Sequence, residues 1–261
     1  MNRLVIDPAS PENAQPLRSA LKVWHYIFKF IARSRELQKI KEVGVGSHST
    51  AEHLESSFKR ELSAHLADVN VMMGSTVPSA IIGTQTIALQ NFTSILPDLA
   101  KIFTTVELVT IVTGFANAIS AVKGNIVIWK LIMYLQLVKG FLFDLPQSRT
   151  LLVEAIVMWI KPHFGRYDEF THTEPEELES SRNNARVSWL QSIRLCVTII
   201  SIMLDKLQQS LIEPSTQADH KLLRQEQDHV EYLLSLIPRF GVFLLIPARL
   251  TFPSQTSRLI S

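Results

Sequence analysis

Residues 125–143 read NIVIWKLIMYLQLVKGFLF, the most continuously apolar stretch of a chain of 261 residues. A strand is one alternative, because Ile126-Val127-Ile128-Trp129 follows Lys123-Gly124-Asn125 as the second arm of a hairpin would. The apolar run, however, continues well past the length of about four to eight residues that is usual for a strand. A helix that is apolar on all sides is normally buried in a core. The stretch therefore predicts the central helix of an all-α protein.

The same stretch raises the question of a membrane, because the mean hydropathy of the chain is +0.15. A spanning helix needs about 20 consecutive, mostly apolar residues. Lys130 and Lys139 interrupt the central run, and the next apolar run, residues 195–204, is too short. The N-terminal residues 1–16 contain three prolines and no apolar core, so they do not form a secretory signal. We expect no transmembrane segment.

Composition narrows the class of protein further. Hydrophobic residues make up 46% of the chain and charged residues 19%, which excludes disorder as the dominant state. The net charge is +2, from 26 basic and 24 acidic residues that are interspersed, so nothing indicates a nucleic-acid partner. The single cysteine, Cys196, excludes an intramolecular disulfide and favours a reducing, cytoplasmic location.

Helical signals precede the central run. A helix is expected over residues 16–41, opened by Pro16, before a break at residues 44–47. Ser49-Thr50-Ala51-Glu52 has the form of a capping box for the next helix, with Glu55 and Lys59 paired on its outer side. The inward residues expected on these two helices are Val23, Ile27, Phe30 and Ile31, then Leu54, Phe58, Leu62, Leu66, Val69 and Met73.

Two further helices are expected before the central run. One starts at Pro78, passes Ile82, Ala88 and Leu89, and ends at Ile95, because Pro97 disfavours its continuation. The other opens with a second capping box, Thr104-Thr105-Val106-Glu107, and runs to about residue 122.

Three more helices are expected after the central run, over residues 148–160, 176–212 and 215–237. Pro162 and Pro214 end the first two, and Arg224 and Asp228 form an outward pair on the third. The inward residues of the last two are Leu178, Ala185, Trp189, Ile193, Cys196, Ile200, Met203 and Leu207, then Leu222, Leu223, Val230, Leu233, Leu234 and Ile237.

These signals divide the chain into three parts: a disordered segment 1–15, a helical domain 16–237 of about eight helices, and a poorly structured tail 238–261. Strand alternation and sustained heptads are both missing, which describes an irregular antiparallel array of helices. No fixed sequence period is present, so a repeat architecture is expected only in a degenerate form.

Catalytic chemistry is not indicated by the residues. His163 and His172 flank a loop with Asp168, Glu169 and Glu174, the only place where metal-ligand types gather, and a solvated polar loop explains it better. Cys196 is expected to be a buried hydrophobe rather than a nucleophile, and the four tryptophans to be core residues.

Other short motifs have structural explanations as well. Gly44-Val45-Gly46 lacks the further residues of a phosphate loop and is expected to be a linker. Glu174, Glu176, Glu177 and Glu179 suit the N-terminus of the helix that follows them. We therefore predict no catalytic, cofactor-binding or metal-binding residue.

Whole segments of the chain resemble the central helical region of the DOCK (dedicator of cytokinesis) family, and look closest to fungal members. The resemblance covers most of residues 16–237. The segments that carry it are Ala20-Leu21-Lys22-Val23-Trp24-His25-Tyr26-Ile27-Phe28-Lys29-Phe30, Ile95-Leu96-Pro97-Asp98-Leu99 with Phe103 and Val106-Glu107-Leu108, Trp129-Lys130-Leu131-Ile132, Leu151-Leu152-Val153-Glu154 and Tyr232-Leu233-Leu234.

The resemblance implies an armadillo-like scaffold of the α-solenoid type, without catalytic activity. Family members are guanine-nucleotide exchange factors for Rac-type small GTPases, and no segment here matches their exchange, lipid-binding or ELMO-engaging regions. Partners are then proteins of small GTPase signalling, and recruitment to membranes would depend on the absent regions. The change of composition after Pro238 suggests a truncated product or a gene-model artefact. An independent adaptor that binds amphipathic helices is the alternative.

Overall fold

The computed structural model describes residues 5, 7–8, 10–43, 48–76, 80–119, 125–164 and 179–236. Within these ranges the regular structure consists of eleven α-helices and one short 3-10 helix, which confirms the all-α class. The helices are α2 (Pro11–Lys22), α3 (Trp24–Val43), α4 (His48–Gly74), α5 (Ile81–Leu99), α6 (Thr105–Ala118), α7 (Asn125–Lys139), α8 (Phe141–Asp144), α9 (Pro146–Ile160), η1 (Lys161–Phe164), α11 (Glu179–Ile212), α12 (Pro214–Ala218) and α13 (His220–Leu234).

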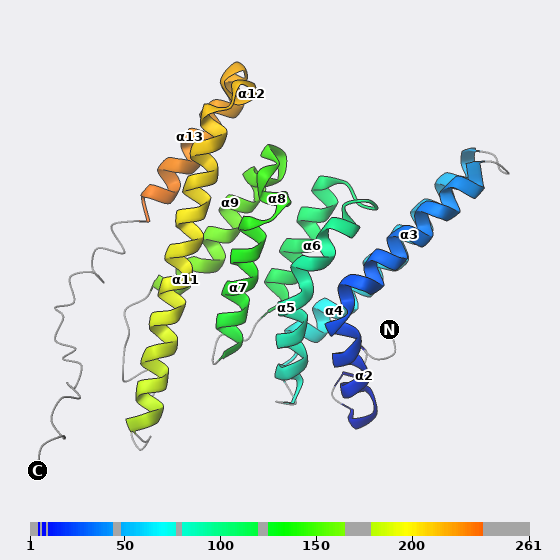
Figure 1. Ribbon diagram of the computed structural model, residues 1–261, viewed down its shortest axis with the longest axis horizontal. Coiled ribbons are helices and arrows are strands. Elements are labelled where there is room, and N and C mark those ends of the chain that lie inside the picture. Colours follow the sequence, from blue (N-terminus) through cyan, green and yellow to red (C-terminus); the bar gives the residue numbers. More distant parts are fainter. Residues whose placement is uncertain are drawn as a thin grey trace, which may run out of the picture.

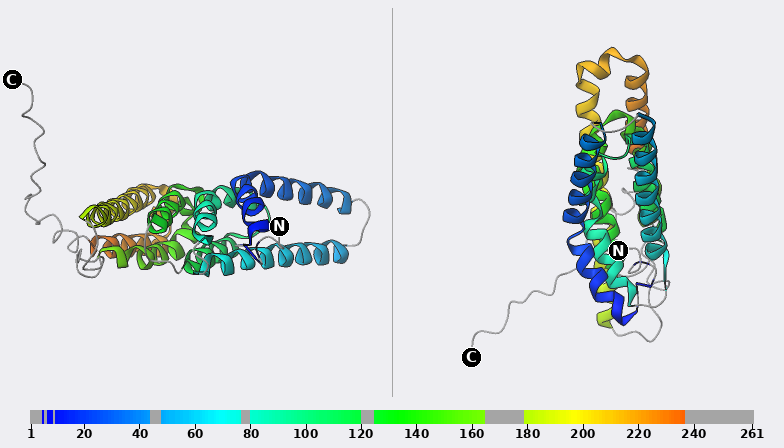
Figure 2. Two further views of the ribbon diagram at one scale, coloured as in Figure 1. Left: turned by 90° about the horizontal axis from the view of Figure 1, so that it is seen from below. Right: turned by 90° about the vertical axis from the view of Figure 1, so that its right-hand side faces the viewer.

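The long helices form two layers. Helices α3, α5, α7 and α11 pack side by side in one layer, and α4, α6, α9 and α13 do so in the other. Figure 1 shows the row running from α3 at one end to α11 at the other, and Figure 2 shows the two layers from below. Each helix of one layer is followed along the chain by its partner in the other, so the fold is a stack of helical hairpins. This confirms the expected solenoid-like array.

Helix α7 occupies the central place that the apolar run predicts. It packs between α5 and α11, and Leu131, Tyr134 and Val138 are fully buried. The helix ends at Lys139, and Gly140 separates it from α8. A Cβ atom on Gly140 would lie 3.3 Å from the carbonyl oxygen of Gln136, so a larger residue would require the preceding turn to shift by a few tenths of an ångström.

Aromatic rings connect the early hairpins within the core. Phe92 of α5 and Phe115 of α6 stack with their centroids 3.8 Å apart, and Trp24 of α3 meets Phe92 at 6.4 Å. Trp24 is fully buried, as expected, whereas Trp129, Trp159 and Trp189 are only partly buried.

The first helix differs from its prediction. Helix α2 begins at Pro11 rather than Pro16, because Ser10 caps it by accepting a hydrogen bond from the Asn13 amide at 3.2 Å. Residues 11–15, expected to be disordered, are therefore helical. Val23 separates α2 from α3, so the expected single helix over 16–41 is two helices.

The predicted inward face of this region is also wrong in part. Val23 and Phe30 are exposed, and the buried positions are Leu17, Leu21 and Trp24, followed by Phe28 and Ala32. The buried residues Trp24, Phe28 and Ala32 each lie one position after a residue that was predicted to face inward. Their spacing is helical too, so the sequence offers two apolar stripes. Leu54 and Leu234, also predicted to face inward, are exposed as well.

Two further helices differ from their predicted limits. Helix α5 continues through Pro97 to Leu99, and the expected helix over 215–237 is interrupted at Asp219 into α12 and α13. The N-cap side chain of α13 is Asp219, whose carboxylate accepts hydrogen bonds from the amides of Lys221 and Leu222.

Several predictions fall outside the described residues. These are the linker at residues 44–46, the side chains of the box at residues 49–51, the loop positions 165–178 and the tail 238–261.

Candidate interaction surfaces

The most polar buried cluster joins α9, α11 and α13. Arg149 of α9 donates from Nε to Glu226 Oε1 of α13 at 2.9 Å, and from a terminal guanidinium nitrogen to Ser210 Oγ of α11 at 2.9 Å. The side chains of Arg149 and Glu226 are 4% and 2% exposed. His229 Nδ1 lies 4.0 Å from the other carboxylate oxygen. The ion pair and the hydrogen bond to Ser210 together connect three helices in the interior of the stack.

The capping box at Thr104 also contacts a neighbouring helix. Thr104 Oγ1 accepts from the Glu107 amide at 3.3 Å, and Glu107 Oε2 accepts from the Thr104 amide at 2.7 Å, which confirms the predicted box. Lys59 of α4 donates to the same carboxylate at 3.1 Å. It therefore pairs with the neighbouring helix α6 and not, as predicted, with Glu55 of its own helix. The Thr104 amide and then the Lys59 ammonium hold the pKa of Glu107 below its ordinary value. Glu55 instead accepts from Arg35 of α3 at 3.0 Å.

A shallow groove lies beside this contact, between α4 and α6. Its volume is about 400 Å³, and small residues on both helices keep it open. A Cβ atom on Gly114 would lie 3.3 Å from Asn70 Nδ2 across it. The lining residues are Ser63, Leu66, Ala67, Asn70, Phe103, Glu107, Thr110, Ile111 and Gly114.

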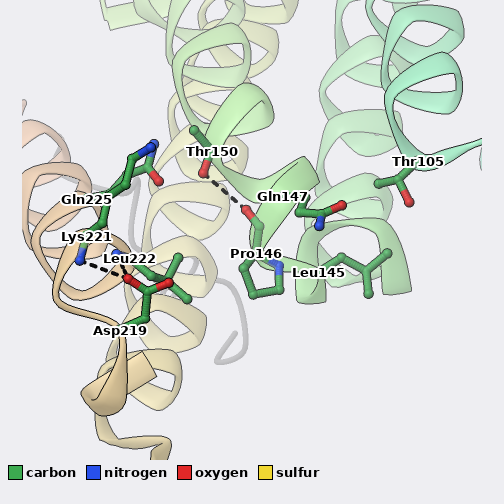
Figure 3. A pocket seen from close by; sticks show the side chains of 9 residues that line it. All are labelled: Thr105, Leu145, Pro146, Gln147, Thr150, Asp219, Lys221, Leu222 and Gln225. Atoms are coloured by element: carbon green, nitrogen blue, oxygen red, sulfur yellow. Dashed lines mark hydrogen bonds between the residues drawn. The ribbon is translucent and has the colours of Figure 1, made fainter. Parts of the chain in front are cut away.

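A second open cleft, of about 530 Å³, lies where α6, α9 and α13 begin (Figure 3). Its charged lining groups are Asp219, which caps α13, and Lys221. Thr150 donates to the Pro146 carbonyl, as the dashed line in the figure marks. The described lining residues include no pair of a nucleophile and a base that contact each other.

The residues that the sequence singled out for chemistry are placed as follows. Cys196 is fully buried in α11, and burial raises the pKa of its thiol to about 12, as expected of a structural cysteine. His163 lies in η1, where burial and then Lys130 lower its pKa. His172, Asp168, Glu169 and Glu174 lie outside the described residues. Among the described residues no group of three or more His, Cys, Asp or Glu could hold a metal ion.

The outer face of α11, at one end of the stack, is partly apolar. Val187, Leu190 and Val197 are 61%, 47% and 44% exposed and follow one another at helical spacing. The opposite face of this helix packs against α7 and α13 through Cys196, Met203 and Leu207 among others.

By length and composition alone, residues Ser180–Ile212 of α11 could cross a membrane, with 28% of the most apolar window buried. The apolar stretch is thus longer than the run at 195–204 from which no span was expected. A single helix of this kind is weak evidence for a membrane span, and one side of α11 packs against α7 and α13.

The outer face of α3, at the other end of the stack, is apolar as well. Tyr26, Phe30 and Ile40 are 68%, 77% and 65% exposed, and Leu37 is half-exposed, as is Val23 just before the helix. Both ends of the row in Figure 1 therefore present side chains that further helices could cover. The sequence pattern placed Val23 and Phe30 inside because it does not indicate which apolar stripe of a helix meets a neighbour.

Comparison with protein families identifies this two-layered stack. A family model for the dedicator of cytokinesis (DOCK) TPR region matches residues 2–237. The chain belongs to the DOCK family. The match confirms the resemblance seen in the sequence, and its helical-hairpin character agrees with the stacked pairs of helices. No curated protein and no solved structure matches the chain.

Membership in the DOCK family agrees with the stacked helical architecture. The match indicates a DOCK-family scaffold region, and the two clefts and the two apolar end faces lie on the outside of this stack. In the buried pair of Arg149 and Glu226, Oε1 of the carboxylate accepts from Arg149, whereas Oε2 has no hydrogen-bond partner among the described residues.

Proposed function

We propose that the chain is a non-catalytic scaffold of a DOCK-type guanine-nucleotide exchange system for Rac-type small GTPases. The observation that carries the proposal is the family match over residues 2–237, on a stack whose end helices both expose apolar faces. In this role the stack spaces two contact surfaces and binds protein partners rather than nucleic acid. Its place of action is the cytoplasm.

The titratable groups support the absence of catalysis as part of this proposal. Arg149 and Glu226 neutralise each other out of reach of solvent, and the Cys196 thiol is protonated at neutral pH. The cleft in Figure 3 has no buried acid or base directed into it from the described residues.

The catalytic half of the proposal is tested by nucleotide exchange. The purified chain, added to a Rac-type GTPase loaded with fluorescent GDP, should leave the rate of GDP release unchanged. A full exchange factor run in parallel is the positive control. Acceleration by the chain alone would contradict the proposal.

The exposure of an apolar end face, on which the scaffold role depends, is tested on the outer face of α11. Replacing Leu190 and Val197 by glutamine should reduce binding of the hydrophobic dye ANS, while the circular dichroism spectrum stays unchanged, because both side chains are exposed. The matched control replaces Gln191 and Ser201, which are exposed polar residues of α11, by alanine. A wild-type chain that is monomeric and does not bind ANS would argue against exposed end faces.

A second candidate function is that of an independent adaptor for amphipathic helices. The exposed face of α3 favours it, since its apolar residues follow the spacing by which one helix packs on another. Capture of a helical partner without any component of a GTPase pathway would distinguish the adaptor from the scaffold.

A further inference from the structure

The exposed residues of α3 form a seam with the spacing of a coiled coil. We define the α3 seam as Val23, at the junction with α2, together with Tyr26, Phe30, Arg33, Leu37 and Ile40 of α3, whose numbers advance alternately by three and by four. Residues at this spacing lie along one side of a helix and fit between the side chains of a facing helix. The apolar members are exposed by 45% to 77%, so the seam is available for packing.

The seam is narrow, and this favours a helix as its occupant. Lys29 and Gln38, which border it, are exposed, and the buried face of α3 is the opposite one, with Trp24, Phe28 and Ala32. A helix lying on a lipid surface uses a broader apolar face.

The charges beside the seam specify the chemistry of the facing helix. Lys29, one residue before Phe30 of α3, occupies a position that in a coiled coil lies against the edge of the partner. Lys22, the last residue of α2, precedes Val23 in the same way at the junction of the two helices. Neither has an acidic partner among the described residues. Glu36 occupies the next equivalent position, but Arg33 binds its carboxylate at 2.6 Å. The edge that is free to pair is therefore cationic.

We propose that the α3 seam binds an amphipathic α-helix that carries Asp or Glu beside its own apolar seam. This deepens the proposed scaffold function by naming the class of partner for one end of the stack. A second copy of the chain fits less well, because Glu36 is already engaged and Lys22 and Lys29 would lack free acids opposite them.

The test uses two synthetic peptides of about 21 residues, which is three heptads. Both have isoleucine and leucine along the seam, and they differ only in having glutamate or lysine at every flanking position. Like charges at these positions prevent each peptide from pairing with itself. In fluorescence anisotropy, the glutamate peptide should bind the full chain at least about tenfold more tightly than the lysine peptide.

Variants connect the binding to the seam. Phe30→Glu should abolish binding of the glutamate peptide, and the double variant Lys22→Glu, Lys29→Glu should invert the preference between the peptides. Lys221→Glu, on the distant helix α13, is the matched control and should change neither. All the substituted side chains are exposed, so circular dichroism should show an unchanged fold.

Three results would overturn the proposal: equal binding of both peptides, dimerisation of the wild-type chain in sedimentation that Phe30→Glu removes, and binding to phosphatidylserine vesicles in preference to the glutamate peptide. None of these outcomes depends on nucleotide exchange, so this proposal and the proposed function can fail separately.

Discussion

At the residue scale, buried polar side chains connect one helix to another through hydrogen bonds. Gln85 of α5 is 1% exposed and donates to the carbonyls of Met72, Met73 and Ser75 at 2.7–3.2 Å. It thereby satisfies acceptors at the C-terminal end of α4, which have no partner within their own helix. One polar side chain thus connects the end of α4 to α5.

The ion pair Arg149–Glu226 should show the cost of an unpaired buried charge. Arg149→Met should lower the free energy of unfolding by about 3 kcal/mol or more, because it leaves Glu226 charged and buried. The double variant Arg149→Met, Glu226→Leu should recover much of this loss. Urea denaturation measures both.

The matched control is the exposed pair Arg33–Glu36, whose side chains are 64% and 58% exposed. Arg33→Gln should cost less than about 1 kcal/mol. An equal cost at the two sites would contradict the role of burial.

The thiol of Cys196 should be unreactive in the folded chain. Burial raises its pKa to about 12, so the thiolate that reacts with Ellman's reagent is scarce at pH 8. In urea the same thiol should react at the rate of an ordinary cysteine. Rapid labelling of the native protein would show that α11 is not packed as described.

At the element scale, the capping box of α6 was recognisable from four consecutive residues because its hydrogen bonds are local. The helix limits predicted at Pro16 and Pro97 were wrong, because α2 begins at Pro11 and α5 continues to Leu99. Pro97 lies in the last turn of α5, where Ile95, Leu96 and Leu99 are buried, so packing holds a turn that the proline alone disfavours.

The Glu107 carboxylate should make the stability of α6 depend on pH. Its pKa is lowered from 4.5, so its contribution is complete above that value and is lost as the pH falls through the lower, folded-state pKa. The gap in unfolding free energy between wild type and Glu107→Gln should therefore be largest near neutral pH and disappear in acid.

Thr104→Ala provides the comparison for this measurement. It removes the hydroxyl acceptor of the box at a cost of about 1 kcal/mol but leaves the carboxylate in place. A gap for Glu107→Gln that does not change with pH would exclude a charged role for the side chain.

At the scale of the whole molecule, the described helices make their main contacts within a hairpin or with the neighbouring hairpin, so stability should vary along the stack. Helices α5, α7 and α9 are packed on two sides, whereas residues 36–41 of α3 and 52–57 of α4 are mostly exposed. Hydrogen exchange should be slowest in the first group and fastest in the second. Uniform protection along the described helices would contradict a stack of this kind.

The sequence by itself determined the helical class, the central place of residues 125–139, the capping box at Thr104 and the family resemblance, because all of these depend on local spacing or on composition. Only the tertiary structure decided that α3 turns Trp24 and Phe28 inward and leaves Tyr26 and Phe30 exposed, and that Glu226 and His229 are buried. A helix such as α3 carries more than one apolar stripe, and only its packing against neighbouring helices selects the one that is removed from water.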